Sequence, residues 1–428
     1  MKLKTTGQHQ DISVFKKLTR ALHPLIKQSA YIRKCNKLSD VDWIETGILR
    51  SIFQEPSGRG FLQSLLDMGR GLLKPSHFFE SLKSKRRLRL CQDVNSLLLQ
   101  QLPESLNNTD PLKDYPELDG YDIYAGDGHY HSASVHDIKT NGKKYPTLHF
   151  YSLDLRTHGL NHMTVADTKD NRKTEHDMRA LKRIPLTDLR QNAPKGRKVI
   201  YVWDRAGIDF QQWYKWKKGG GIYFISREKK NMRLTTIADL KVDHSSSVNN
   251  GVDSHELVGP ASGVAMSRIK YTCPLTGATF TFLTNLTNIP PGLIAYLYKL
   301  RWDIEKVFDQ VKNKMIEKKA WAASDTAKTM QAEFVCLAHN LMLLLEGELK
   351  EEGIENVVEL KRQAQRFQEE IETIQRDGKQ IPVCLFKITR FTQRSIRFIR
   401  WLRNSIFTMA SWRAAVPSLR LAYADFQQ

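Results

Sequence analysis

The stretch YKLRWDIEKVFDQVKNK, residues 298–314, combines a helical apolar period with a line of polar side chains. On a helix at about 100° per residue, four polar side chains fall within roughly a 60° arc: Tyr298, Arg301, Glu305 and Lys312. Apolar residues gather on the opposite side: Leu300, Ile304, Val307 and Val311. We therefore expect one face to pack against a core and the other to present charge. The simpler interpretation is an amphipathic helix with a surface ion pair between Arg301 and Glu305.

Two aspartates follow β-type patterns and favour a functional interpretation. Asp127 lies near the end of the run YDIYAGDGHY, residues 121–130, between Gly126 and Gly128. Asp204 directly follows KVIYVW, residues 198–203, a nearly continuous apolar run typical of a strand buried on both faces. Acids at strand ends of an α/β sheet point into the crevice where ligands bind. Together with Glu305 they would hold two divalent ions about 4 Å apart, and oxygen ligands suit Mg²⁺ or Mn²⁺.

Other residues compete for these roles. Asp122, Asp154 and Asp209 are alternative aspartates, but Asp122 has the opposite strand parity to Asp127 and Asp154 lacks flanking glycines. His129 and His131 alternate with Asp127, so all three would share one face of a strand. These imidazoles are either metal ligands or neighbours of a phosphate pocket.

The spacing Tyr298-x2-Arg301-x3-Glu305-x6-Lys312 reproduces the motif Y-(2)-R-(3)-E-(6)-K. In this respect the chain resembles a large group of bacterial insertion-sequence transposases of the DDE superfamily. The order of its parts is also similar. The resemblance implies an α/β ribonuclease-H-like catalytic core with a β-rich insertion, flanked by helical N- and C-terminal regions.

The resemblance further implies a role for each motif residue. Asp127, Asp204 and Glu305 would be catalytic ligands of two Mg²⁺ ions, with Mn²⁺ as a substitute. Tyr298, Arg301 and Lys312 would contact the DNA end. Such an enzyme cleaves at terminal inverted repeats of double-stranded DNA and transfers the 3′-hydroxyl strands into target DNA. It acts as a homodimer or a higher synaptic oligomer.

The patterning divides the chain into five expected parts. Residues 1–105 read as a helical DNA-binding domain, and 105–120 include a linker rich in Pro, Asn and Asp. Residues 106–218 form the first part of the catalytic core, 219–290 a β-strand insertion, and 291–345 the second part of the core with Glu305. Residues 346–428 form a basic helical region.

Charge points to a polyanionic partner. The 428 residues hold 66 Lys and Arg against 46 Asp and Glu, a net charge of +20, which favours nucleic acid through phosphate neutralisation. Two basic stretches are candidate phosphate contacts, although each could equally be a solvated helix face. The first contains Lys83, Lys85, Arg86 and Arg87. The second is a cationic helical stripe that includes Arg390, Arg394 and Arg397, a pattern also typical of membrane-surface helices.

The cysteine pattern and the hydropathy indicate where in the cell the protein is expected. The five cysteines include no CxxC pair, so neither a zinc ribbon nor a disulfide framework is indicated. The most apolar run, residues 334–345, contains His339 and Asn340 and is too short to span a bilayer. We expect a cytoplasmic, nucleoid-associated bacterial protein without a membrane partner.

Two alternative functions stay open. One is a metal-dependent endonuclease of the same fold without strand transfer, and the other is a catalytically silent DNA-binding protein. In family members that form hairpin ends, an aromatic residue of the β insertion stacks on a flipped base. The aromatic candidates here are better explained as strand core, so hairpin formation stays open: Tyr223, Phe224, Tyr271, Phe280 and Phe282.

Overall fold

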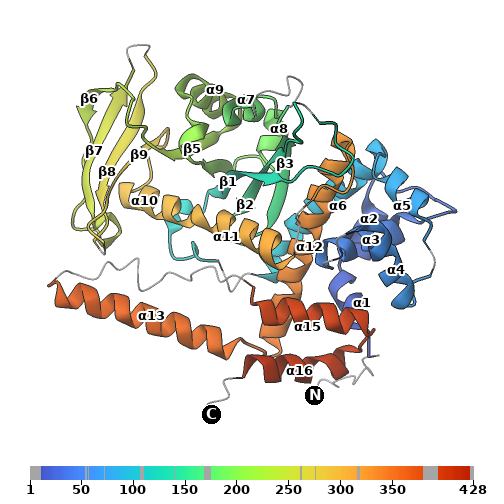
Figure 1. The fold of residues 1–428 in the computed structure, drawn as a ribbon. Helices are drawn as coiled ribbons and strands as arrows, with labels where there is room; N and C mark the ends of the chain where they lie inside the picture. The colour runs from blue at the N-terminus through green and yellow to red at the C-terminus, as the bar shows by residue number, and fades with distance from the viewer. Residues whose placement is uncertain are drawn as a thin grey trace, which may run out of the picture.

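The computed structural model describes residues 11–53, 55, 57–71, 73–106, 110–139, 141–167, 175–260, 263–274, 276–315, 319–378 and 394–424. Within them the chain forms one mixed nine-stranded sheet with helices on both faces (Figure 1). The strand order is β3-β2-β1-β4-β5-β9-β8-β7-β6.

The N-terminal part is helical, as predicted. Its helices are α1 (Val14–Thr19), α2 (Leu22–Gln28), α3 (Asp40–Ile52), α4 (Gly58–Asp67), α5 (Pro75–Ser81) and α6 (Lys85–Ser105). Helix α3 begins with a side-chain cap, because the Ser39 hydroxyl accepts a hydrogen bond from the Asp42 N–H (3.0 Å). This cap satisfies one of the backbone donors left unpaired at a helix start.

The centre of the sheet is parallel. It contains β1 (Tyr121–His131), β4 (Lys198–Val202) and β5 (Ile222–Arg227), whose apolar runs suit strands covered on both faces. Two antiparallel strands, β2 (Thr147–Asp154) and β3 (Leu160–Val165), extend the sheet beyond β1. Because β5 pairs with β4, the insertion boundary expected at residue 219 lies ahead of a strand of the central sheet.

The β-strand insertion expected at residues 219–290 contains an antiparallel unit. It is a meander of β6 (Thr235–Asp239), β7 (Val252–Gly259), β8 (Met266–Thr272) and β9 (Thr279–Thr284). Strand β9 pairs with β5, so the meander continues the central sheet and projects to the left in Figure 1.

Helices cover the two faces of the sheet differently. On one face, α7 (Asp177–Lys182), α8 (Leu186–Leu189) and α9 (Phe210–Gly220) enclose a core rich in aromatic residues. Trp213 of α9, for example, stacks on Phe224 with ring centroids 5.4 Å apart. The other face receives α10 (Pro291–Leu300), α11 (Trp302–Asp309) and α12 (Asp325–Glu351). Three short 3₁₀ turns are η2 (Pro116–Leu118), η3 (Arg205–Gly207) and η4 (Ser247–Asn249).

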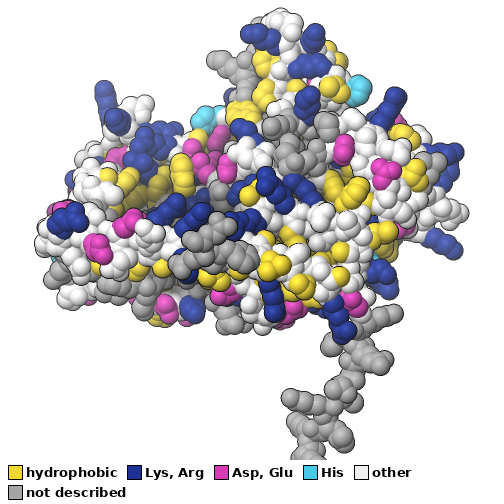
Figure 2. All heavy atoms as spheres, turned by 60° about the horizontal axis from the view of Figure 1, so that its bottom comes forward, with side chains coloured by type: hydrophobic (Ala, Val, Ile, Leu, Met, Phe, Trp, Pro, Cys, Tyr) yellow, Lys and Arg dark blue, Asp and Glu magenta, His cyan; other side chains and the backbone are white. Residues whose placement is uncertain are grey.

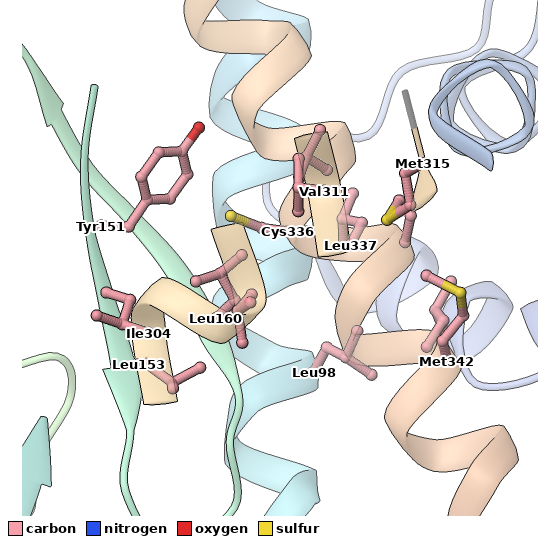
Figure 3. Close-up of a cluster of buried hydrophobic side chains, with 14 of the residues drawn as sticks. Leu98, Tyr151, Leu153, Leu160, Ile304, Val311, Met315, Cys336, Leu337 and Met342 are labelled. Atoms are coloured by element: carbon pink, nitrogen blue, oxygen red, sulfur yellow. The ribbon is translucent and has the colours of Figure 1, made fainter. Parts of the chain in front are cut away.

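A single core joins the N-terminal helices to the sheet. Helix α12 packs against α3, α6 and β3, and Figure 3 shows Leu98 of α6, Leu160 of β3, Ile304 of α11 and Leu337 of α12 in one buried cluster. The predicted N-terminal domain is therefore packed into the body of the protein. The predicted linker is also packed, since Leu112 and Leu118 are fully buried.

The C-terminal part is helical where it is described, as expected. It comprises α13 (Val357–Arg376), α15 (Ile396–Phe407) and α16 (Trp412–Tyr423). Helices α15 and α16 contact α1, and the Trp412 N–H donates to the Ile12 carbonyl (2.7 Å). Helix α13 extends away from the body along the bottom of Figure 1. None of the described helices has the length and hydropathy needed to cross a membrane.

Candidate active site

Asp127 and Asp204 lie at the same level on neighbouring strands. The parallel register of β1 and β4 pairs Ala125 with Val202, and each aspartate follows two residues later. Asp127 is not at the end of its strand, however. Strand β1 continues to His131 because β2 pairs with it on the other edge, whereas β4 ends at Val202. Asp127 therefore lies on β1 just beyond the point where its parallel pairing with β4 stops.

The glycines around the aspartates make room for Trp203. A Cβ added at Gly126 would lie 1.8 Å from the Trp203 ring, and one at Gly207 would lie 2.4 Å from it. Trp203 is fully buried, and its indole packs directly against the backbone at Gly126 and Gly207, because glycine has no side chain. This packing fixes the residue immediately before Asp204.

Asp204 is also held by hydrogen bonds. Its carboxylate accepts from the Ala206 N–H (2.7 Å) and caps η3. Its carbonyl accepts from the Ser226 hydroxyl of β5 (2.7 Å). Both contacts leave the carboxylate at the carboxyl end of the parallel strands, as the sequence predicted.

Glu305 comes from the α10–α11 segment, whose apolar face is as predicted. Leu300, Ile304, Val307 and Val311 are all buried. The segment is not one regular helix, because α10 ends at Leu300 and a π-helical turn covers Gln310–Lys314. A π turn holds more residues than an α turn. Lys312, which is exposed, therefore lies beyond the regular helix on which its alignment with Glu305 was predicted.

Arg301 joins two of the three carboxylates. Its Nη1 lies 3.1 Å from Asp127 Oδ2, and its Nη2 lies 2.9 Å from Glu305 Oε1. The guanidinium side chain is 8% exposed, whereas that of Glu305 is 37% exposed. Burial alone would lower the pKa of Arg301, but the attraction of Asp127 and Glu305 outweighs it and the pKa is raised. Arg301 is therefore the internal counter-charge of the site.

The three carboxylates influence one another electrostatically. The pKa of Asp127 is raised to about 7, first by burial and further by the charges of Asp204 and Glu305. Arg301 and the Gly128 N–H oppose this rise without cancelling it. Crowded carboxylates of this kind favour a bound cation.

The three carboxylates are of the type that binds divalent metal ions, and Arg301 contacts two of them in this structure. Across the described ranges no three His, Cys, Asp or Glu side chains are close enough to share one ion, and Arg301 contacts both Asp127 and Glu305. The donor set consists of hard carboxylate oxygens around an uncompensated negative charge, which fits Mg²⁺ or Mn²⁺.

Two arginines beside the site were not singled out from the sequence. Arg227 ends β5, and its pKa is lowered by burial and then by the nearby charges of Arg205 and Arg301. Three guanidiniums thus lie close enough to repel one another. The signal was available, since Arg227 follows the apolar run IYFIS just as Asp204 follows KVIYVW.

Two further side chains line the same region. Tyr298 is half-buried, with its ring 5.1 Å from that of Phe282 on β9. Asp177, at the start of α7, has a pKa raised by burial and then by the charge of Asp204. Nothing in the sequence pattern distinguished Asp177 from the other acids of its charged segment.

The rival aspartates have structural partners. Asp122 pairs with Arg197 (2.7 Å), and Asp154 accepts from the backbone N–H of Arg156 (2.7 Å). Asp209 caps α9 by accepting from Gln212 (2.9 Å).

The histidines of β1 contact protein groups. The ring of His129 stacks on Phe308 at 4.7 Å, and His131 Nε2 lies 2.7 Å from the Tyr151 hydroxyl. The two rings lie 5.4 Å apart on one face of the strand, as predicted. These contacts favour a packing role over metal ligation.

The aromatic residues of the β insertion largely form strand core. Tyr223, Phe224 and Phe282 are buried, as expected. Tyr271 and Phe280 are only partly buried and pack against the core. Phe280 also lies beneath the Arg227 guanidinium, 4.8 Å from ring centroid to Cζ.

The first basic stretch has two kinds of member. Lys83 and Lys85 are exposed, which is compatible with phosphate contact. Arg86 and Arg87 instead turn inward and bind Asp40, with their nearest nitrogens 2.7 and 3.2 Å from its oxygens. Their placement explains them as interior ion pairs, in contrast to the DNA contacts expected.

The C-terminal stripe is not a single helix in the described residues. Helix α15 begins at Ile396, and Arg394 before it is 5% exposed and pairs with Glu346 (2.6 Å). Arg397 is exposed, and Arg390 lies outside the described residues. In Figure 2 Lys and Arg side chains are distributed over most of the face shown, with acidic side chains between them. Phosphate contact by Arg397 stays a prediction.

Comparison with known families agrees with this geometry. Residues 118–341 match the family model described as the transposase DDE domain. The chain belongs to the DDE transposases. The matched range contains β1, β4 and α11, and therefore all three carboxylates. Membership implies a ribonuclease-H-like core, a DNA partner and a divalent metal. A search of curated proteins found no match.

Proposed function

We propose that this protein is a cut-and-paste transposase that cleaves transposon ends and transfers the 3′-hydroxyl strands to target DNA. One observation carries the proposal. Asp127 and Asp204 extend from the same level of two parallel strands, and Glu305 is joined to Asp127 through Arg301. Three carboxylates from three separate elements, with open access at Glu305, suit phosphoryl transfer on a large substrate.

In this proposal Asp127, Asp204 and Glu305 hold two Mg²⁺ ions, which Mn²⁺ replaces. When bound, the metal ions activate the attacking oxygen and stabilise the leaving oxygen in an in-line displacement at phosphorus. Arg301 releases the carboxylates and binds a phosphate oxygen, helped by Arg205 and Arg227. Tyr298 and Lys312 contact the DNA end.

The assignment to the Y-(2)-R-(3)-E-(6)-K group rests on the residues at 298–312. It extends the proposal to bacterial insertion sequences, to terminal inverted repeats as substrate, and to a dimer or higher oligomer that pairs two ends. The surplus of basic residues supports a DNA partner.

A divalent-metal assay tests the proposal on labelled DNA that carries the inverted repeats flanking the gene. Joined products support transposition, cleavage alone supports an endonuclease, and shifted but uncut DNA supports a binding protein. Asp204→Asn and Glu305→Gln are expected to abolish cleavage. Asp122→Asn is the matched control, because Asp122 lies on the same strand as Asp127 but pairs with Arg197. Full cleavage by either site variant would contradict the proposed ligands.

A further inference from the structure

A cationic cleft lies between the N-terminal helices and the segment that leads into α12, apart from the three carboxylates. Its volume is about 1070 Å³, and its wall includes Arg50 at the end of α3, the start of α4, and residues 319–324. This volume slightly exceeds the ~300–1,000 Å³ that is typical of small-molecule sites. The cleft is therefore large enough for more than a single small anion.

Arg50 is the unusual residue of this cleft. Its guanidinium lies 4.5 Å from the Trp321 ring, 5.2 Å from Phe79 and 5.7 Å from Phe61. Its Nη1 is buried without a hydrogen-bond partner, and within the described part of the chain it forms no ion pair. Burial alone lowers the pKa of Arg50 to about 10. A buried guanidinium nitrogen without a hydrogen-bond acceptor is costly, which suggests that a ligand supplies the missing acceptor.

The surroundings of Arg50 favour an anion. The wall carries three more cations, Arg59, Lys83 and Lys319, against the carboxylates of Glu55 and Glu80. Lys83 pairs with Glu80 (3.1 Å), while Arg59 and Lys319 are exposed. The cations therefore outnumber the carboxylates around the unpaired guanidinium.

Two helix starts add to the positive potential. Ser57 caps α4 and Ser324 caps α12, and both line the cleft. Helix N-termini favour negative charge. Gly58 lets Phe79 and Arg50 approach the start of α4 closely, since a Cβ there would lie 2.2 Å from Phe79 and 2.9 Å from Arg50 Nη1.

The cleft is connected to the catalytic strand. Val135 and His136 of its wall follow β1, and the Ala320 N–H donates to the Ser132 carbonyl (2.9 Å). From Asp127 to the end of β1 is four residues, about 13 Å. A DNA strand held at the carboxylates and continuing along β1 would reach the cleft after a few nucleotides.

We propose that this cleft binds the phosphate backbone of DNA a few nucleotides from the cleavage position, with Arg50 as the central contact. The ligand is a phosphodiester strand, and the aromatic wall provides an apolar side for the sugar. This inference rests on the proposed DNA substrate, but it concerns a site separate from the carboxylates.

Arg50→Met tests the proposal, because methionine fills the aromatic cage without charge. Binding of a labelled duplex is measured in EDTA, so that the result does not depend on cleavage. We expect unchanged or increased thermal stability, about tenfold weaker binding, and a salt slope reduced by about one. Arg33→Met, an exposed arginine that does not line the cleft, is the matched control and should bind as wild type.

Several results would overturn the proposal. Lower stability of Arg50→Met with wild-type affinity and salt slope would mean that Arg50 only supports the fold. If this variant does not fold, Lys319→Met provides the test instead, because Lys319 is exposed. An unchanged salt slope of duplex binding in Lys319→Met would contradict the proposed site. Arg50-dependent binding of pyrophosphate or thymidine monophosphate without any effect on duplex binding would indicate a small-anion pocket. Failure of the proposed function would appear differently, as absent metal-dependent cleavage by the wild type.

Discussion

Two buried arginine–carboxylate clusters of this protein use similar groups with opposite results. At Asp40, two guanidiniums, Arg86 and Arg87, bind one carboxylate whose side chain is 1% exposed. Burial raises the pKa of Asp40, but the hydrogen bond from Arg86 and further attractions outweigh it, and the pKa is lowered. At Asp127, one guanidinium joins two carboxylates, and a third carboxylate, Asp204, lies close enough to act on them. The pKa of Asp127 is raised to about 7.

The difference indicates what each cluster requires. In the Asp40 cluster the negative charge of the single carboxylate is compensated inside the protein by two guanidiniums. In the Asp127 cluster a single guanidinium pairs with two carboxylates, and Glu305 is partly exposed, so an external cation would stabilise this group. Both clusters contain arginine. The number of guanidiniums for each carboxylate is what distinguishes them.

The largest expected effect is on catalysis at Asp127. Asp127→Asn removes one of the proposed metal ligands, and because metal ions contribute several kcal/mol to such reactions, cleavage should fall about 10³-fold or more. The variant should fold as well as wild type, because the substitution removes one of three carboxylates that repel one another. Strand cleavage and thermal unfolding measured on the same preparation check both statements, and cleavage within tenfold of wild type would contradict the first.

The same change at Asp40 should act on folding instead. Asp40→Asn leaves Arg86 and Arg87 without their carboxylate, and breaking a buried pair costs about 3–5 kcal/mol. Urea unfolding should show a free energy of unfolding lower by this amount. Cleavage per folded molecule should stay at the wild-type level, and a selective loss of cleavage would remove the distinction between the clusters.

A smaller effect is expected at Arg301. Arg301→Gln leaves the three carboxylates without their internal counter-charge, which should lower the free energy of unfolding by about 1–2 kcal/mol in EDTA. Mg²⁺ should raise the melting temperature of this variant more than that of wild type, because it supplies the missing charge. Arg197→Gln, which removes only the partner of Asp122, is the control and should show no additional response to Mg²⁺.

The smallest expected effect is on pH dependence. The pKa of Asp40 is lowered in the folded protein, so its contribution to stability is fully present above its unfolded value of about 4. That contribution is lost as the pH falls through the lower folded value. Urea midpoints between pH 2 and 5 should decline less steeply for Asp40→Asn than for wild type, and parallel curves would contradict the assignment.

Local patterns in the sequence predicted much of this site. The buried face of residues 300–311, the buried strand before Asp204 and the shared face of Asp127 and His129 all depend on side-chain periodicity along a single element. Contacts between distant elements were not predictable in this way. The partner of Arg86 is Asp40, and the strand that extends β1 beyond Asp127 is β2.

The expected domain boundaries depended on composition and were less informative. Residues 1–105 are helical and basic in part, but the faces of α3 and α6 that pack on α12 are matched by residues more than 200 positions later. Composition cannot reveal that an apolar face is completed so far along the chain. Similarly, the polar segment before β1 carries Leu112 and Leu118, whose burial depends on the folded body.

The packing of α12 on α3 and α6 has a consequence for synthesis of the chain. Helices α1, α3 and α6 leave the ribosome before α12, and the faces that they pack against α12 stay uncovered until residues 325–351 have been translated. A chain that terminates before α12 would therefore expose these apolar faces to solvent. The fold therefore makes the packing of the N-terminal helices depend on translation of the helix that follows Glu305.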